Sequence, residues 1–447
     1  MNKEKILSFW RQNRVLILIL AGSFLASVVY SFHFRINPAV DARAYDNIAQ
    51  NIVSGNGYRE HLTGELANDF AIARVGPLYE YFLAGIYKIF GHSHGVVWFW
   101  QALLHSLSAW LVYLTALLVF VDNDKRKKIG LIAAVIFGFY PDLIEISAML
   151  MTETLYLFLV CLMIYLFFLY LSKGGNWRPA LLGLSSGLAT LARPPVLFLI
   201  PVILFYFWRQ KLWRPALLFL VVLILVFMPW TVRNYQVYGQ FMPFGAAGQF
   251  NFWIGNYHGG SGEQEPTVQH QQFLETHKAV DINSESMEQF KGFVFNYPAE
   301  FLKLTLLRMN KYISVIRPMG FWFYQKGLGQ FLFIFSSAAA SIILFVSGLG
   351  GAIKSFMEHK ERFYYLLALT IATPLIIFIT VVETRYRFQV YPLLSIFAGY
   401  FFTYLFSGRK WLLDKVLLLS IALIFTNGLI DLLLSFAKLK ERLGLFF

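Results

Sequence analysis

The chain has 447 residues, of which 57% are hydrophobic and 14% are charged, and its formal net charge is +13. Soluble globular domains carry about 25% charged residues, so this composition excludes an ordinary soluble fold and predicts an all-α polytopic membrane protein. The positive charge falls in short clusters between apolar runs instead of forming one continuous face. This distribution argues against a nucleic-acid-binding protein.

Apolar runs long enough to cross a bilayer recur from one end of the chain to the other. A crossing needs roughly 20 apolar residues, and we count about 11 spans, some of them short. The first run is too long for the h-region of a signal peptide and no cleavage pattern follows it, so we expect an uncleaved helix. The clearest spans are residues 15–34, 96–121, 152–171, 215–228, 328–351, 364–382 and 390–406.

The basic clusters predict the topology. They precede the first span and then recur in every second loop, which places those loops in the cytoplasm by the positive-inside rule. Two long loops, residues 35–95 and 231–325, then face outward. A basic tail that contains Lys438, Lys440 and Arg442 conflicts with this topology, and one miscounted late span would explain the conflict.

This topology divides the chain into three parts. Residues 1–235 are expected to form a transmembrane module that includes the first outer loop, 35–95. Residues 236–325 are expected to form an outer loop that faces the donor or the acceptor, and 326–447 the C-terminal transmembrane helices. A glycine-rich stretch at 245–262 lacks the Gly-Lys-Ser/Thr ending of a nucleotide-binding loop. It is either substrate-facing or a plain connection.

The first outer loop begins with Asp41 and contains two predicted helices. Residues 44–53 have apolar side chains at helical spacing and end at Gly55, and residues 77–90 read as a second helix along the interface. A carboxylate just outside a span can deprotonate an incoming hydroxyl group. Aspartate is also a preferred helix N-cap, so Asp41 has two readings of equal weight: a general base or a cap for the helix at 44–53.

Other acidic residues also lie near the expected outer surface. Glu153 begins an apolar helix, where a charge is costly and usually functional; the alternative is an interfacial carboxylate in water. Asp142 and Glu145 share a short outer turn that follows Pro141. They are weaker candidates, although either can bind a metal together with Asp41.

Arginines on the outer side need a reason, because most basic residues map to the cytoplasm. A guanidinium stays charged and binds phosphate oxygens bidentately, so a phosphate is the expected partner. For any single arginine the alternative is a lipid headgroup or an ion pair, such as Arg385 with Glu383. The five candidates for donor phosphate binding are Arg74, Arg193, Arg233, Arg385 and Arg387.

Histidine and cysteine give weaker signals. The outer histidines lack a metal-ligand spacing, and His92 and His94 are two residues apart, a pair that can bind metal on a strand but not on a helix face. We therefore expect structural or solvated roles and no protein metal site. The single cysteine, Cys161, lies in an apolar run, which excludes an internal disulfide framework.

The residues above occur in an order that resembles the GT-C class of polyprenol-phosphate-sugar-dependent glycosyltransferases, the bacterial relatives of protein O-mannosyltransferases and of the lipid A aminoarabinose transferase. The resemblance covers most of the chain, and no single piece of it is strongly specific. Four polar residues in these pieces are candidate substrate-binding residues: Tyr45, Tyr58, Asn234 and Asn256. The main pieces are Asp41 to Tyr58, Arg74-Val-Gly-Pro77, Tyr140-Pro141, Glu153-Thr-Leu, Gly187 to Pro194, Pro229 to Asn234, Gly255-Asn256 and Arg385-Tyr-Arg387.

The resemblance implies a catalytic acid at Asp41. The Asp-Glu pair that is common in this class is Asp41-Ala42 here, so the second acid is missing at that position. Glu153 occupies the place of a second acid in aminoarabinose transferases, and Arg74 the place of their phosphate-binding lysine. Asp41 and Glu153 are therefore the catalytic candidates.

The resemblance also implies a reaction and a location. One sugar would pass from a polyprenyl phosphate, such as undecaprenyl phosphate, to a hydroxyl group of a lipid, glycan or protein acceptor, with inversion, at the outer face of the bacterial cytoplasmic membrane. No cofactor is required, and a divalent metal is compatible with the scheme. The alternatives are a lipid-linked-sugar flippase or transporter and an O-antigen ligase or polymerase. A transporter is expected to show two matching halves, and we find no internal repeat.

Overall fold

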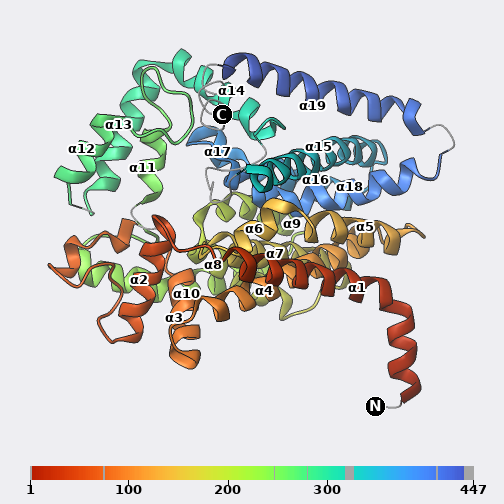
Figure 1. The fold of residues 1–447 in the computed structure, drawn as a ribbon, viewed down its shortest axis with the longest axis horizontal. Coiled ribbons are helices and arrows are strands. Elements are labelled where there is room, and N and C mark those ends of the chain that lie inside the picture. Colours follow the sequence, from red (N-terminus) through yellow and green to blue (C-terminus); the bar gives the residue numbers. More distant parts are fainter. Residues whose placement is uncertain are drawn as a thin grey trace.

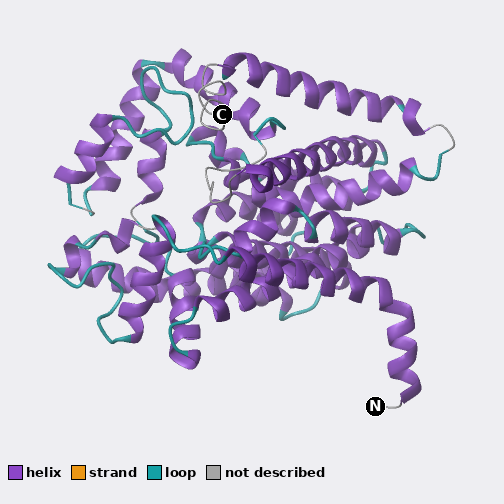
Figure 2. Cartoon of the chain, in the orientation of Figure 1, coloured by secondary structure: helices purple, strands orange, loops and turns teal. Residues whose placement is uncertain are grey.

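The fold is built from helices joined by turns. The computed structural model describes residues 3–73, 76–245, 247–278, 280–317, 327–408 and 411–436. Within these ranges the extended structure amounts to one isolated β-bridge, between Glu263 and Val382 (Figure 2). The all-α prediction from composition is confirmed, whereas the basic tail with Lys438, Lys440 and Arg442 lies outside the described residues.

Eight helical segments are long and apolar enough to cross a membrane, or nine if a bent pair of helices is one span. This makes the chain a multi-pass membrane protein. The count of about 11 stays a prediction, since α8 (Arg178–Ala192) has only 15 residues, fewer than the roughly 20 of a straight crossing. The spans are Asn13–Phe34 within α1 (Lys3–Phe34), α4 (His94–Val119), α7 (Glu153–Lys173), α10 (Trp213–Tyr238), α15 (Gly327–Met357), α16 (Glu361–Ala372) with α17 (Leu375–Ile379), η4 (Thr384–Val390) with α18 (Tyr391–Leu405), α19 (Lys415–Leu434), and the bent pair α5 (Arg126–Gly138) and α6 (Pro141–Ser147).

The two long loops fold into short helices that gather at one end of the bundle. Most helices of the two loops lie at the left of Figure 1, whereas the start of α1, the α4–α5 turn and the start of α19 lie at the opposite end. This arrangement agrees with the two-sided topology expected from charge. The remaining helices are α2 (Asp41–Val53), η1 (Leu66–Asn68), η2 (Phe70–Ala73), α3 (Leu78–Phe90), η3 (Pro194–Leu199), α9 (Ile200–Arg209), α11 (Ala247–Ile254), α12 (Val268–Thr276), α13 (Ile282–Asn296), α14 (Pro298–Ile313) and η5 (Trp411–Leu413).

Both helices predicted in the first outer loop are present. The helix expected at 44–53 is α2, which ends before Gly55, and Gly55 has a φ of 81°. The helix expected at 77–90 is α3. The N-cap position of α2 is Val40 and no side chain caps the helix there, so Asp41 is the first helical residue. The capping reading of Asp41 is therefore not what the structure shows.

The centre of the bundle is formed by α7 and by the η4–α18 span. Their most apolar windows are 72% and 89% buried, against 22%, 17% and 22% for α1, α10 and α19. The outer helices expose apolar side chains where lipid replaces water as the solvent. Glu153 and Arg385 thus belong to the two most enclosed spans of the described chain.

Close helix packing depends on small residues. A Cβ on Gly351 of α15 would come within 2.0 Å of the Phe397 carbonyl oxygen in α18, and one on Gly399 within 2.4 Å of the Ile129 carbonyl oxygen in α5. Only glycine allows backbones to approach so closely, as in other membrane helix pairs. The contacts hold α18, which directly follows η4, close to α5 and α15.

Candidate active site

Four of the charged residues singled out from the sequence meet at the end of the central helices where the two long loops gather. Asp41 begins α2, Glu153 begins α7, Arg193 follows the last residue of α8, and Arg385 lies in η4. Arg193 is placed by the proline that follows it, because a residue before proline avoids the helical region. Its φ of −155° and ψ of 121° are extended.

Arg385 connects three carboxylates. Its Nε donates to Glu383 at 2.6 Å, and its Nη1 lies 3.4 Å from an Asp41 oxygen and 3.9 Å from a Glu153 oxygen. The Asp41 side chain is 27% exposed, whereas those of Arg385 and Glu153 are 9% and 3% exposed. Asp41 is therefore the carboxylate of this group that a substrate in the loop region can reach.

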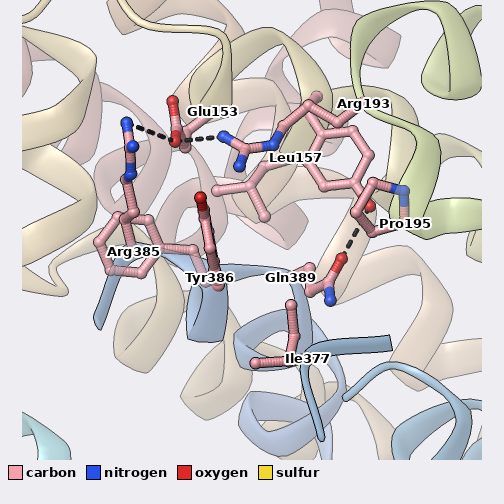
Figure 3. A pocket seen from close by; sticks show the side chains of 10 residues that line it. Glu153, Leu157, Arg193, Pro195, Ile377, Arg385, Tyr386 and Gln389 are labelled. Carbon is pink, nitrogen blue, oxygen red and sulfur yellow. Dashed lines mark hydrogen bonds and ion pairs between the residues drawn. The ribbon is translucent and has the colours of Figure 1, made fainter. Parts of the chain in front are cut away.

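Glu153 is shared between two guanidinium groups (Figure 3). Arg193 donates to its carboxylate and also to the Thr152 hydroxyl oxygen, at 3.2 Å. Burial disfavours the charged form of Arg193, but the Glu153 carboxylate outweighs burial and raises the pKa of Arg193 above its ordinary value. Both arginines therefore stay charged here.

A small pocket opens between these side chains. Figure 3 shows Glu153, Arg193 and Arg385 at one end and Gln389 and Ile377 at the other. The Tyr386 ring lies 5.3 Å from the Arg193 guanidinium carbon and 5.5 Å from that of Arg385, distances at which a ring face attracts a cation. The pocket combines two cations with an apolar floor, a surface suited to a phosphate on a hydrocarbon carrier.

Tyr45 is the predicted substrate-binding residue nearest this cluster. It lies on α2 and is 2% exposed, with its ring 5.6 Å from that of Tyr79. Burial, followed by the carboxylates of Asp41 and Glu80, raises the pKa of Tyr45 well above its ordinary value. Its hydroxyl group therefore keeps its proton.

Two of the predicted phosphate-binding arginines lie apart from the cluster. Arg233 donates to the Tyr58 carbonyl oxygen at 3.1 Å and stacks on aromatic rings, including that of Trp230 at 5.0 Å. Arg387 is 1% exposed and donates to the Ser314 carbonyl oxygen at 2.6 Å. Both join separate segments of the backbone. The fifth arginine, Arg74, lies outside the described residues.

The remaining predicted substrate-binding residues hold the second loop in place. Asn234 is fully buried and donates to the Met242 carbonyl oxygen at 2.8 Å. Asn256, also fully buried, donates to the Ile379 carbonyl oxygen at 2.9 Å and accepts from Arg308 at 3.0 Å. The fourth, Tyr58, packs its ring against Trp230 at 4.8 Å. The structure does not bring these three side chains to the cluster around Asp41.

The described residues do not gather Asp41 with Asp142 or Glu145 into a metal-ligand group. The Asp142 carboxylate accepts a hydrogen bond from Ser337, and Asp41 faces Arg385. Among the described residues, the one group with metal-ligand geometry is Asp46, His92 and His94. Sequence reasoning gave these histidines a structural role, because it had no means of placing Asp46 beside them.

Sequence reasoning also missed several members of the cluster. Glu383 was expected only as an ion-pair partner of Arg385, and that pair is present. Tyr386 and Gln389 follow on η4, and Gln389 accepts a hydrogen bond from Tyr156 at 2.8 Å. The available signal was the run of polar residues from Glu383 to Gln389 directly before an apolar helix.

Comparison by sequence finds one family. The model of the family described as dolichyl-phosphate-mannose-protein mannosyltransferase matches residues 74–232. This segment contains Glu153 and Arg193, whereas Asp41 precedes it and Arg385 follows it. No curated protein sequence matches the chain.

Comparison by structure extends the likeness to nearly the whole chain. The oligosaccharyltransferase of Archaeoglobus fulgidus in its apo form aligns with a TM-score of 0.56 at 15% identity, over 96% of this chain and 55% of that one. The same enzyme, AglB, in complex with an inhibitory peptide and a dolichol-phosphate gives 0.54 at 15% identity, over 94% and 56%. ArnT from Cupriavidus metallidurans bound to undecaprenyl phosphate gives 0.41 at 11% identity, over 89% and 79%. The chain spans about half the length of the oligosaccharyltransferase structures, and the two alignments with that enzyme establish the fold.

Proposed function

We propose that this chain, which belongs to the GT-C superfamily of membrane glycosyltransferases, moves a single sugar from a polyprenyl-phosphate donor to a hydroxyl group. The acceptor is a lipid, glycan or protein at the outer face of the bacterial cytoplasmic membrane. The observation that carries the proposal is the cluster itself: Asp41, the accessible carboxylate, lies 3.4 Å from Arg385 beside a pocket lined by two arginines.

The choice of donor rests on charge and on the relatives. The family that matches by sequence is described by a dolichyl-phosphate sugar, and AglB was solved with a dolichol-phosphate. A polyprenyl phosphate needs cations beside an apolar surface, and the pocket offers Arg193 and Arg385 next to Leu157, Ile377 and Phe388. The same chemistry applies to any carrier lipid that ends in a phosphate.

The cluster supports one inverting displacement. The Asp41 carboxylate accepts the proton of the acceptor hydroxyl group, whose oxygen attacks C1 of the sugar while the bond from C1 to the phosphate oxygen breaks. The polyprenyl phosphate leaves with the bonding electrons, and Arg193 and Arg385 stabilise its added charge. Glu153 holds both guanidinium groups in position. General-base assistance of this kind contributes about 10²–10⁴-fold in rate.

The test is transfer by the purified full chain in lipid nanodiscs. A panel of polyprenyl-phosphate monosaccharides and polyprenyl-diphosphate oligosaccharides is offered with an envelope lipid extract as acceptor, and mass spectrometry detects the glycosylated product and the released carrier. The proposal expects turnover with one or more monosaccharide phosphates. Turnover only with diphosphate oligosaccharides would instead identify a ligase, polymerase or oligosaccharyltransferase activity. Movement of the donor across the bilayer without transfer would identify a flippase.

Binding of the carrier provides an independent measurement. Polyprenyl phosphate without a sugar should bind the wild-type chain and bind Arg193→Gln much more weakly, because a phosphate contact to a charged group is lost. Arg209→Gln is the matched control, since Arg209 is an exposed arginine paired with Glu361 at 3.7 Å. Equal carrier binding by the two variants would contradict a phosphate site in the pocket.

A further inference from the structure

A second cluster of ligand-type side chains lies on α2, away from Asp41. Asp46 is on α2, His92 is in the turn between α3 and α4, and His94 is the first residue of α4. One ligand atom from each lies within 4.8 Å of the other two. Residues five apart on a helix are separated by about 140° around its axis. Asp46 therefore does not share the face of α2 that carries Asp41.

The distances in this cluster suit a tetrahedral ion. His92 Nε2 is 3.0 Å from one Asp46 oxygen, and His94 Nε2 is 3.5 Å from the other. Ligand atoms held about 2.1 Å from a zinc ion at tetrahedral angles lie about 3.4 Å from one another. The two imidazole rings are nearly perpendicular, with 5.0 Å between their centroids. Small side-chain shifts would bring all three atoms to bonding distance of a single ion.

One nitrogen of the cluster makes only a long polar contact. His94 Nε2 is buried, and its 3.5 Å approach to Asp46 falls short of good hydrogen-bond geometry among the described residues. A long contact compensates only in part for the lost contacts with water, and a bound cation would compensate for the rest. The His92, His94 and Asp46 side chains are 44%, 26% and 10% exposed, so an ion has a path of entry and room for a water ligand.

Neighbouring side chains orient the Asp46 carboxylate. Tyr87 donates to one of its oxygens at 2.5 Å and Gln50 to the other at 3.0 Å. Metal-binding carboxylates are commonly oriented by hydrogen bonds of this kind.

We propose that Asp46, His92 and His94 bind a zinc(II) ion, with water as the fourth ligand. The three residues come from α2, from the α3–α4 turn and from α4, so the ion fastens α2 to the corner where α3 meets α4. The ion takes no part in sugar transfer. It fixes the helix whose first residue is Asp41, and the site is independent of the donor that the enzyme uses.

The experiment measures bound metal. The full chain, purified in nanodiscs with an affinity tag that contains no histidine, is stripped with a chelator, reloaded with Zn²⁺, separated from free ion and analysed by mass spectrometry of the elements. The proposal expects about one zinc per chain. In a parallel sample Co²⁺ replaces zinc, and its visible absorption reports tetrahedral nitrogen and oxygen ligands.

Substitutions locate the ion. His92→Ala, His94→Ala and Asp46→Asn should each lose the zinc, and Tyr87→Phe should weaken binding by about 10–100-fold, as expected for a residue that orients a ligand. His258→Ala is the matched control, since His258 also pairs with a carboxylate, Glu300 at 2.8 Å, and its side chain is 59% exposed. It should keep the zinc.

Two results would overturn the proposal. Wild-type chain without stoichiometric zinc would show that the three residues form only a hydrogen-bonded corner, and zinc retained in His92→Ala and in His94→Ala would place the ion elsewhere. If an alanine variant does not fold, His92→Cys decides the question. Its thiolate should keep the ion and add sulfur-to-cobalt charge transfer to the Co²⁺ spectrum, and an unchanged spectrum would exclude position 92 as a ligand.

Discussion

Glu153→Gln removes one negative charge from the most enclosed ion network near the candidate active site. The Glu153 side chain is 3% exposed and contacts both Arg193 and Arg385. Removing one partner of a buried pair costs about 3–5 kcal/mol, because the other charge stays buried without compensation. Arg193 keeps its hydrogen bond to Thr152, and Arg385 keeps its contact with Glu383. We therefore expect a loss near the lower end, about 3 kcal/mol.

The matched control is Glu361→Gln. Glu361 also pairs with an arginine, Arg209 at 3.7 Å, but the two side chains are 47% and 54% exposed. Exposed pairs contribute about 0–1 kcal/mol, so this variant should be close to wild type. The assay is reversible unfolding in mixed detergent micelles, with the free energy of unfolding compared between the two variants. Equal free energies would refute the description of Glu153 as a buried anchor for two arginines.

Two further substitutions test the packing of the second long loop against the central helices. Gly255→Ala should be destabilising by about 1–3 kcal/mol, since a Cβ there would come within 1.9 Å of the Thr380 carbonyl oxygen. Gly248→Ala is the control and should be tolerated, because the new Cβ meets no atom within 4 Å. Thermal unfolding of the two variants measures the difference. Arg308 is fully buried and donates to the carbonyl oxygens of Phe378, Gly255 and Thr380. Each buried acceptor that loses its donor costs about 1–3 kcal/mol, so Arg308→Met should lower the free energy of unfolding by at least about 3 kcal/mol. Wild-type stability of Arg308→Met in the same assay would contradict this role.

Local sequence signals predicted the elements well. The helical spacing and the glycine stop of α2 are contained within about 15 consecutive residues, so periodicity was sufficient there. The spans were predicted from continuous apolar runs of roughly 20 residues. Glu153 was singled out because a charge in an apolar helix is costly, Asp41 as a carboxylate just outside a span, and Arg193 and Arg385 because they map to the sparsely basic side. These criteria use only the neighbouring residues in the sequence, and they do not say which of the selected residues contact one another.

What could not be predicted depends on contacts between distant parts of the chain. Asp41 and Arg385 are 344 positions apart, and no spacing rule relates them. The sequence likewise treated the five arginines alike, although Arg387 donates to a backbone carbonyl group and Arg193 faces the pocket. The grouping of Asp46 with His92 and His94 arises only when α2 packs against α3.

The central claim is that Asp41 acts as the base in sugar transfer. The most direct measurement is the turnover of Asp41→Asn with a donor that the wild-type chain uses, alongside the Michaelis constant for that donor. We expect a fall in kcat of about 10²–10⁴-fold, with folding and donor binding retained, because Arg385 keeps its contacts with Glu383 and Glu153. Near-normal turnover in Asp41→Asn would contradict it.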